Sequence, residues 1–248
     1  MSRPAFVVFD LDGTLIDGYA AIGDALGYAM ERLGASPLSP ARVRGMVGHG
    51  LERLLEEAVG ADRAAEGVRL FRERYPEVAI AKSHLLAGVS EVLAELDERG
   101  HPMAVASNKP PRFSRMILEA NGLAGLLRGV GGPDAETPAK PDPTMLVRLM
   151  ALVGESAANT VVVGDMEVDF EFARAAGCRV VLIPNGSRTR EELAAVAPDA
   201  FLASIGELPA WLSLPPSSGR GSSFPGSGKG SMQAAPATAR WDDERIRK

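Results

Sequence analysis

Residues 5–17 read AFVVFDLDGTLID, a run of five apolar residues followed at once by Asp10 and Asp12. The unbroken apolar run predicts a strand that is buried on both faces of a sheet. Similar runs recur at 103–106 (MAVA), 160–164 (TVVVG) and 179–183 (RVVLI), with helical periodicity between them. Strands that alternate with helices predict an α/β fold of the Rossmann-like type, in which a parallel sheet carries helices on both faces.

The interval before the helix expected at 89–99 has a different pattern. Residues 17–86 contain four helical patterns and no convincing strand, at 20–33, 39–47, 50–59 and 61–75. We therefore predict an α-helical cap at 17–86, inserted into a catalytic core formed by 1–16 and 87–212. The apolar residues at helical spacing in this interval are expected to form the interior of the cap and its seam with the sheet: Met30, Leu33, Leu51, Leu54, Leu55 and Phe71.

Composition excludes several classes of protein. The chain has 248 residues, 46% of them apolar, and a net charge of −5, so it lacks the excess of basic residues that nucleic acids or anionic membranes attract. It contains no apolar run long enough to span a bilayer, and its single cysteine, Cys178, excludes an intramolecular disulfide. We expect a cytoplasmic protein of undetermined oligomeric state. Residues 213–248, rich in Gly, Pro and Ser, are predicted to form a disordered tail.

The acidic pair after the first strand is the strongest chemical signal. In an extended backbone Asp10 and Asp12 point to the same side, at the strand end where α/β folds bind ligands. Two adjacent carboxylates repel each other unless a cation neutralises them or one of them holds a proton. The first solution suits Mg²⁺, which prefers oxygen ligands, and the second would make one aspartate a general acid. Gly13 allows the sharp turn that follows.

An Asp-Gly pair after a strand can also be a simple turn. Three polar groups near later strand ends favour a binding site instead: Ser107-Asn108-Lys109, Lys140, and Gly164-Asp165 with Asp169. A parallel sheet would bring them to one edge. Asp10, Asp12, Asp165 and Asp169 together carry a charge of −4, or −3 if Asp12 holds a proton, against which Mg²⁺ and Lys140 would together supply +3. A phosphate dianion is therefore accommodated only when both cations are present.

These motifs resemble those of the haloacid dehalogenase-like hydrolase superfamily. The resemblance rests on FDLDGTLID at 9–17, a hydroxyl residue at a strand end, a lysine, and GDMEVDF at 164–170, all in the expected order. Within this superfamily the sequence is most similar to the phosphoglycolate phosphatase family. Four further segments carry that similarity: VRGMVGHGLERLLEEA (43–58), ASNKP (106–110), AKPDP (139–143) and ARAAGCRVVLIPNG (173–186).

The resemblance implies a Mg²⁺-dependent phosphomonoester hydrolase that forms an aspartyl-phosphate on Asp10. Asp12 would be the general acid and then the general base. Mg²⁺ would be held by Asp10, the backbone carbonyl of Asp12, and Asp165. The phosphoryl group would be bound by Ser107, the backbone N–H of Asn108, and Lys140. The residues expected to support these groups are Gly13, Thr14, Gly164 and Asp169; Asp169 could alternatively only cap a helix.

The resemblance also implies a small phosphorylated metabolite as substrate, with 2-phosphoglycolate as the first candidate. Its carboxylate would lie at the start of the helix expected at 50–59, near Gly48, His49 and Gly50, with Arg44 as a partner. His49 could equally be a surface residue, and Lys109 is expected to be an exposed neighbour. Two alternatives remain: an intramolecular sugar-phosphate mutase, and a catalytically silent relative that binds phosphorylated ligands. The second is suggested by Met166, which stands where the family usually has Ser or Thr.

Overall fold

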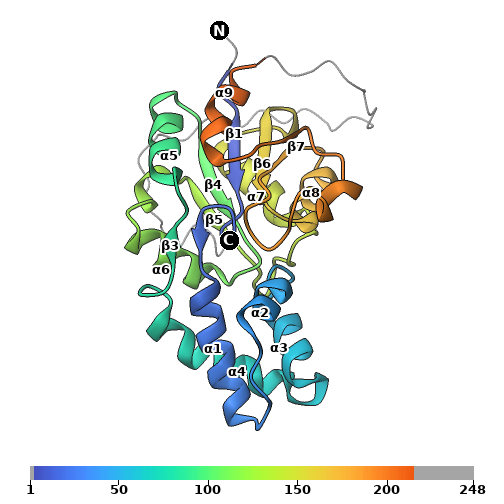
Figure 1. Ribbon diagram of the computed structural model, residues 1–248. Helices are drawn as coiled ribbons and strands as arrows, with labels where there is room; N and C mark the ends of the chain where they lie inside the picture. The colour runs from blue at the N-terminus through green and yellow to red at the C-terminus, as the bar shows by residue number, and fades with distance from the viewer. Residues whose placement is uncertain (1–2, 215–248) are drawn as a thin grey trace.

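The computed structural model describes residues 3–214, and the expected tail at 213–248 lies almost entirely outside them. Six strands form one parallel sheet in the order β5-β4-β1-β6-β7-β8 (Figure 1). Their bounds are β1 (Phe6–Phe9), β4 (Met103–Ala106), β5 (Gly129–Gly131), β6 (Thr160–Gly164), β7 (Arg179–Leu182) and β8 (Ala200–Phe201). The central strand β1 lies between β4 and β6, so its last residues end in the middle of the sheet edge. This confirms the predicted fold class.

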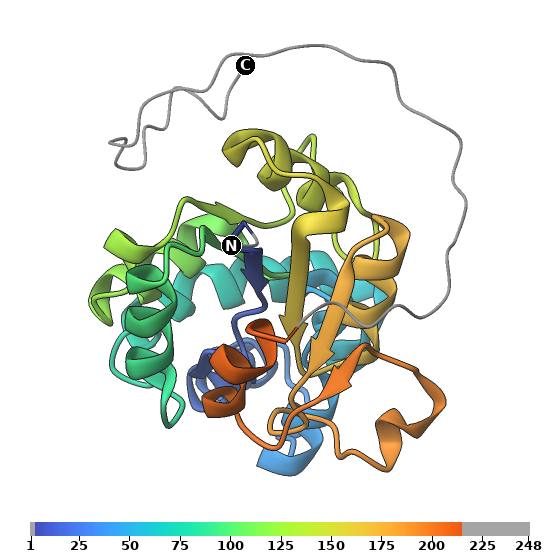
Figure 2. The ribbon, with the colours of Figure 1, turned by 90° about the horizontal axis from the view of Figure 1, so that it is seen from above.

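Both faces of the sheet are covered by helices, as the continuous apolar runs require. Val7 and Phe9 of β1 pack toward α5 (Val89–Glu98), α6 (Pro111–Ala120) and α9 (Leu208–Leu212). Phe6 and Val8 face the opposite way, toward α7 (Thr144–Val153) and α8 (Glu167–Ala175). Figure 2 shows the green helix α5 and the olive helix α7 on opposite sides of the strands. Successive residues of β1 therefore pack alternately into the two apolar layers on opposite faces of the sheet.

Four helices follow β1 and lie below the carboxyl edge of the sheet in Figure 1. They are α1 (Tyr19–Arg32), α2 (Pro40–Met46), α3 (Leu51–Val59) and α4 (Ala61–Val78). The expected apolar residues of this region are buried, except that Leu33 is only partly buried. Among the helices of residues 3–214, none combines the length and the apolar character needed to cross a bilayer.

Four short strands were not predicted. β2 (Ile16–Asp17) and β3 (His84–Leu85) pair antiparallel where the chain enters and leaves the four helices, so the interval 17–86 does contain strand residues. β5 reads GVG and β8 reads AF, and neither offers an apolar run long enough to be recognised. Their pairing with longer neighbours, rather than their own sequence, makes them strands.

Candidate active site

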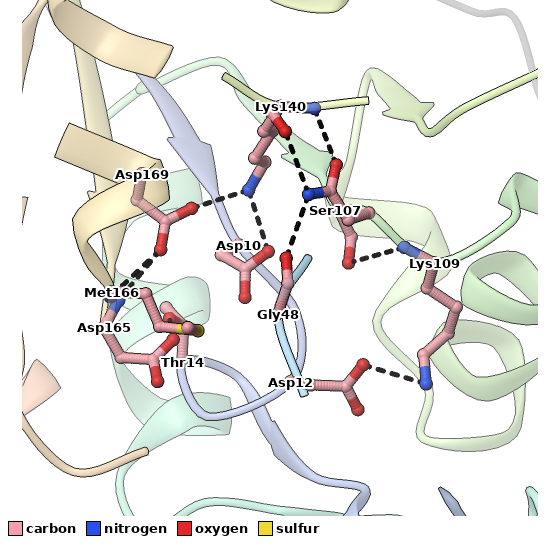
Figure 3. Close-up of polar contacts among 11 residues, drawn as sticks. Asp10, Asp12, Thr14, Gly48, Ser107, Lys109, Lys140, Asp165, Met166 and Asp169 are labelled. Atoms are coloured by element: carbon pink, nitrogen blue, oxygen red, sulfur yellow. Dashed lines mark hydrogen bonds and ion pairs between the residues drawn. The ribbon is translucent and has the colours of Figure 1, made fainter. Parts of the chain in front are cut away.

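The carboxyl ends of β1 and β6 carry the acidic residues of the site, and Lys140 lies between them (Figure 3). The Asp10 N–H donates to the Val163 carbonyl at 2.8 Å, which fixes the residue after β1 against β6. The Lys140 ammonium, with a side chain only 1% exposed, contacts Asp10 Oδ1 at 2.8 Å and Asp169 Oδ1 at 2.7 Å. Burial raises the pKa of Asp10 to about 7, although Lys140 opposes that rise. A buried cation therefore holds two carboxylates close together.

Asp165 is fully buried beside this group. Its carboxylate accepts hydrogen bonds from Thr14 Oγ1 at 3.3 Å and from the Ser187 N–H at 3.2 Å. Gly13 has a φ of +91°, and a Cβ at this position would lie 2.5 Å from Asp165 Oδ2, so the turn after β1 needs glycine. Burial raises the pKa of Asp165, and the charges of Asp10 and Asp169 raise it further. The Asp165 carboxylate is thus held in place by hydrogen bonds from uncharged donors, and these do not neutralise its charge.

Asp169 both caps the first turn of α8 and binds Lys140. Its Oδ2 accepts the N–H groups of Asp165 and Met166, each at 3.2 Å, while its Oδ1 faces Lys140. Gly164 gives it room, because a Cβ there would lie 2.3 Å from Asp169 Cγ. The two expected roles of Asp169, helix cap and support of the site, therefore coexist in one side chain.

Three carboxylates could share a metal ion. One oxygen each from Asp10, Asp165 and Asp169 lies within 4.8 Å of the other two. All are hard oxygen donors, and burial together with their mutual repulsion raises the pKa of Asp10 and Asp165, an effect that a divalent cation would oppose. Asp169 Oδ1 already contacts the Lys140 ammonium and its Oδ2 caps α8, whereas Asp165 accepts hydrogen bonds only from the uncharged donors of Thr14 and Ser187, so Asp165 is the better ligand beside Asp10. The donor set fits Mg²⁺.

Ser107 and Asn108 follow β4 at the same edge, and both are buried. Asn108 Oδ1 accepts the Lys140 N–H at 2.7 Å, and its Nδ2 donates to the Gly48 carbonyl at 2.9 Å. Ser107 Oγ accepts the Lys109 N–H at 3.3 Å. The Asn108 side chain therefore joins the lysine loop to the loop between α2 and α3.

The expectation that Lys109 is exposed was wrong. Its side chain is only 7% exposed, and its ammonium lies 2.8 Å from Asp12 Oδ2. The same ammonium donates to Tyr75 Oη on α4 at 2.6 Å. Asp12 Oδ1 is buried and has no hydrogen-bond partner among the described residues. Asp12 thus points away from the Asp10, Asp165 and Asp169 group and toward Lys109, as Figure 3 shows. The position of Lys109 directly after Ser107-Asn108 was the available signal for this pair.

A pocket lies between the sheet edge and the four helices. Its polar side includes Asp10, Asp12, Lys109 and Lys140. The apolar residues that line it are Ile22, Val47, Leu51, Leu54, Phe71, Tyr75, Pro110, Phe113, Met166 and Val168. Charged and apolar side chains therefore line the same pocket.

The cap residues proposed from the sequence divide into two groups. Gly48 and Gly50 line the pocket, whereas Arg44 and His49 lie outside its lining. Arg44 instead contacts Asp17 at 3.5 Å and stacks 4.0 Å from the ring centre of Tyr19. Met166 packs against the loop between α2 and α3, because a Cβ on Gly48 would lie 2.3 Å from Met166 Sδ. Met166, which stands where the family usually has Ser or Thr, thus makes an apolar contact with the loop between α2 and α3.

Comparisons with known proteins identify the family to which this chain belongs. The family model for haloacid dehalogenase-like hydrolases matches residues 7–183. A phosphoglycolate phosphatase of Vibrio parahaemolyticus is 34% identical over 212 residues, which cover 82% of this chain and 93% of the relative. A phosphoglycolate phosphatase of Rhodospirillum rubrum is 34% identical over 223 residues, covering 86% and 92%.

A solved structure gives the same result for the fold. The crystal structure of a predicted phosphoglycolate phosphatase from Haemophilus somnus superposes with a TM-score of 0.78 at 26% identity. The match covers 85% of this chain and 99% of that one. The chain therefore belongs to the haloacid dehalogenase-like hydrolase family and is a phosphatase within it.

Proposed function

We propose that this phosphatase is a Mg²⁺-dependent phosphomonoester hydrolase in which Asp10 becomes transiently phosphorylated. The observation that carries the proposal is the contact of Lys140 with both Asp10 and Asp169, beside the buried Asp165. Mg²⁺ would be held by Asp10, Asp165 and the backbone carbonyl of Asp12, and would supply positive charge to the phosphoryl oxygens. Asp10, Asp12 and Asp165 carry the chemistry, and the remaining groups bind the phosphoryl oxygens or position these aspartates.

The residues divide the reaction into two steps. An Asp10 oxygen attacks phosphorus, the ester P–O bond breaks, and the departing alkoxide takes a proton from Asp12. Asp12 then removes a proton from a water molecule, whose oxygen attacks phosphorus and releases Asp10 together with inorganic phosphate. Lys140 stabilises the oxygens of the phosphoryl group with its buried charge, and Ser107 and the Asn108 N–H bind them from the end of β4.

We assign residues 17–86 the role of a cap over a core formed by 1–16 and 87–212. Asn108 holds the cap loop at Gly48 to the core, and the pocket lies between the two parts. A closed cap would exclude bulk water and bring cap residues to the leaving group.

The substrate we propose is 2-phosphoglycolate, a small phosphorylated metabolite of the cytoplasm. Support comes from the names of the relatives, which are 34% identical over most of the chain. The sugar-phosphate mutase considered above would convert its substrate without net release of phosphate, and a silent relative would release none.

A screen of phosphorylated metabolites, with and without Mg²⁺, tests the proposal. We expect phosphate release from 2-phosphoglycolate that requires Mg²⁺. Isomerisation of a sugar phosphate without release would favour the mutase. Binding without turnover of any ester would exclude the hydrolase.

A further inference from the structure

Lys109 contacts the proposed general acid and the cap at once. Its ammonium lies 2.8 Å from Asp12 Oδ2, donates to Tyr75 Oη at 2.6 Å, and lies 4.8 Å from the centre of the Tyr75 ring. These two polar contacts use two of its three N–H groups, and no third polar partner occurs among the described residues. Lys109 is one of the residues that line the pocket, where a bound molecule would contact it.

Lys109 is the cationic side chain on the side of the pocket toward which Asp12 points. Among the described residues that line the pocket, the cationic side chains are Lys109 and Lys140. Lys140 already contacts Asp10 and Asp169 and faces the phosphoryl group. Lys109 contacts Asp12 alone among carboxylates. The surrounding wall is apolar, with Leu54, Phe71 and Phe113, and an anion buried there needs a cation.

Asp12 fixes where the leaving group must lie. To protonate the ester oxygen, its carboxylate has to reach that oxygen. Lys109 is one ion-pair distance from the same carboxylate, so it lies beside the first atoms of the leaving group. A substrate carboxylate one carbon from the ester oxygen would therefore compete with Asp12 for the Lys109 ammonium.

We infer that Lys109 binds the carboxylate of the substrate and thereby releases Asp12 toward the ester oxygen. The inference rests on the proposed hydrolase and names its substrate class: phosphomonoesters of short hydroxy acids. It moves the anion site from Arg44 and the Gly48-His49-Gly50 loop, considered above, to the strand end. Lys109 is then both a specificity residue and a positioning residue for Asp12.

Binding measurements test this independently of turnover. In an Asp10→Asn background, calorimetry would compare 2-phosphoglycolate with its uncharged amide, phosphoglycolamide. We expect the carboxylate to bind about 10- to 100-fold more tightly, as for a charge-assisted hydrogen bond. Adding Lys109→Gln should reduce this ratio to about 1, and Lys109→Arg should restore most of it. Lys82→Gln, which breaks an exposed lysine–aspartate pair with Asp24, should leave the ratio unchanged.

A second substitution gives an effect in the opposite direction. Because Asp12 competes for the ammonium, Asp12→Asn in the same background should increase the ratio several-fold while Lys109 stays in place. This variant keeps the test decisive if Lys109→Gln does not fold. If Lys109 had only a structural role, the ratio of the two affinities would not increase in Asp12→Asn.

Three results would overturn the inference. They are equal binding of the two ligands, an unchanged ratio in Lys109→Gln, or a ratio that collapses in Arg44→Gln instead. None of these concerns phosphate release by the unaltered enzyme. If that enzyme hydrolyses both esters equally with Mg²⁺, the proposed hydrolase stands and the assignment of Lys109 fails. If the unaltered enzyme hydrolyses neither ester but the binding ratio changes as expected in the variants, the assignment of Lys109 stands and the proposed hydrolase fails.

Discussion

The pocket has two walls that differ in chemical character: the core wall, formed by residues of 1–16 and 87–212, and the cap wall, formed by residues of 17–86. The core wall carries the charged groups of the pocket, and side chains such as Lys140 and Asp169 are each held by two or more polar contacts. The cap wall is apolar, with Leu54 and Phe71 packed in the same cluster that holds the cap together. Charge fixed by many contacts suits the invariant phosphoryl group, whereas an apolar wall on separate helices suits selection among leaving groups. Changes in the two walls should therefore have different consequences.

The largest effect is expected from the core wall. Asp10→Asn replaces the attacking oxygen but keeps the size of the side chain. We expect kcat to fall by about 10⁴ or more while the fold is retained, because the covalent step is lost. Phosphate release and the circular dichroism spectrum would measure the two properties. Asp97→Asn, an exposed aspartate on α5, is the matched control, and residual turnover above a few per cent in Asp10→Asn would remove Asp10 as nucleophile.

Asp12→Asn should give a smaller loss that depends on the leaving group. A general acid matters most when the leaving alkoxide is basic, so we expect kcat/KM, which reports the first step and not the hydrolysis of the aspartyl-phosphate, to fall about 100-fold for 2-phosphoglycolate. For p-nitrophenyl phosphate, whose leaving group needs no proton, the fall should be under about tenfold. Steady-state rates on both esters measure the difference. Equal losses would show that Asp12 does not donate the proton.

The crowded carboxylates predict a stability that depends on pH and metal. The folded-state pKa of Asp10 is raised from 3.8 to about 7, so between these values the folded state binds more protons than the unfolded state. Stability without metal should therefore fall as the pH rises from about 4 to about 7, and the buried Asp165 adds to the trend. Thermal unfolding in EDTA would show this fall.

Excess Mg²⁺ should reduce the same fall, because it binds the deprotonated carboxylates of the folded state. Asp10→Asn should also flatten the profile measured in EDTA. A melting temperature in EDTA that rises steadily from pH 4 to 7 would contradict the proposed origin of the pKa shift.

The core wall could be predicted from the sequence because it follows from topology. The carboxyl ends of parallel strands meet at one edge, so Asp10 and Asp165 had to approach each other once β1 and β6 were recognised. The expected strands and most helix ends agree with the structure to within about two residues. The cis bond between Lys140 and Pro141, by contrast, has no signal in the local sequence pattern.

The cap wall could not be predicted in the same way. Lys109 contacts Tyr75, which is 34 residues away in sequence and belongs to a helix whose position relative to the sheet is not set by periodicity. Helical spacing identified Phe71 and Leu54 as interior residues, but not that they also line the pocket. Arg44 was placed near the substrate by its neighbours in sequence, whereas its side chain turns to Asp17. The contacts that long side chains such as Lys109 and Arg44 make between the core and the cap can be assigned only from the packed structure.

The smallest expected effect lies where the two walls meet. Tyr75→Phe removes the hydroxyl that accepts from Lys109 but keeps the stack with Phe71 at 5.1 Å and the edge contact with Phe113 at 4.9 Å. We expect a loss of about 1 to 2 kcal/mol in the free energy of unfolding, because a buried ammonium loses an acceptor. Tyr28→Phe removes an exposed hydroxyl bonded to Glu73 and should cost less than about 0.5 kcal/mol. Urea unfolding measures both, and equal costs would mean that the Lys109 contact contributes no more than a surface hydrogen bond.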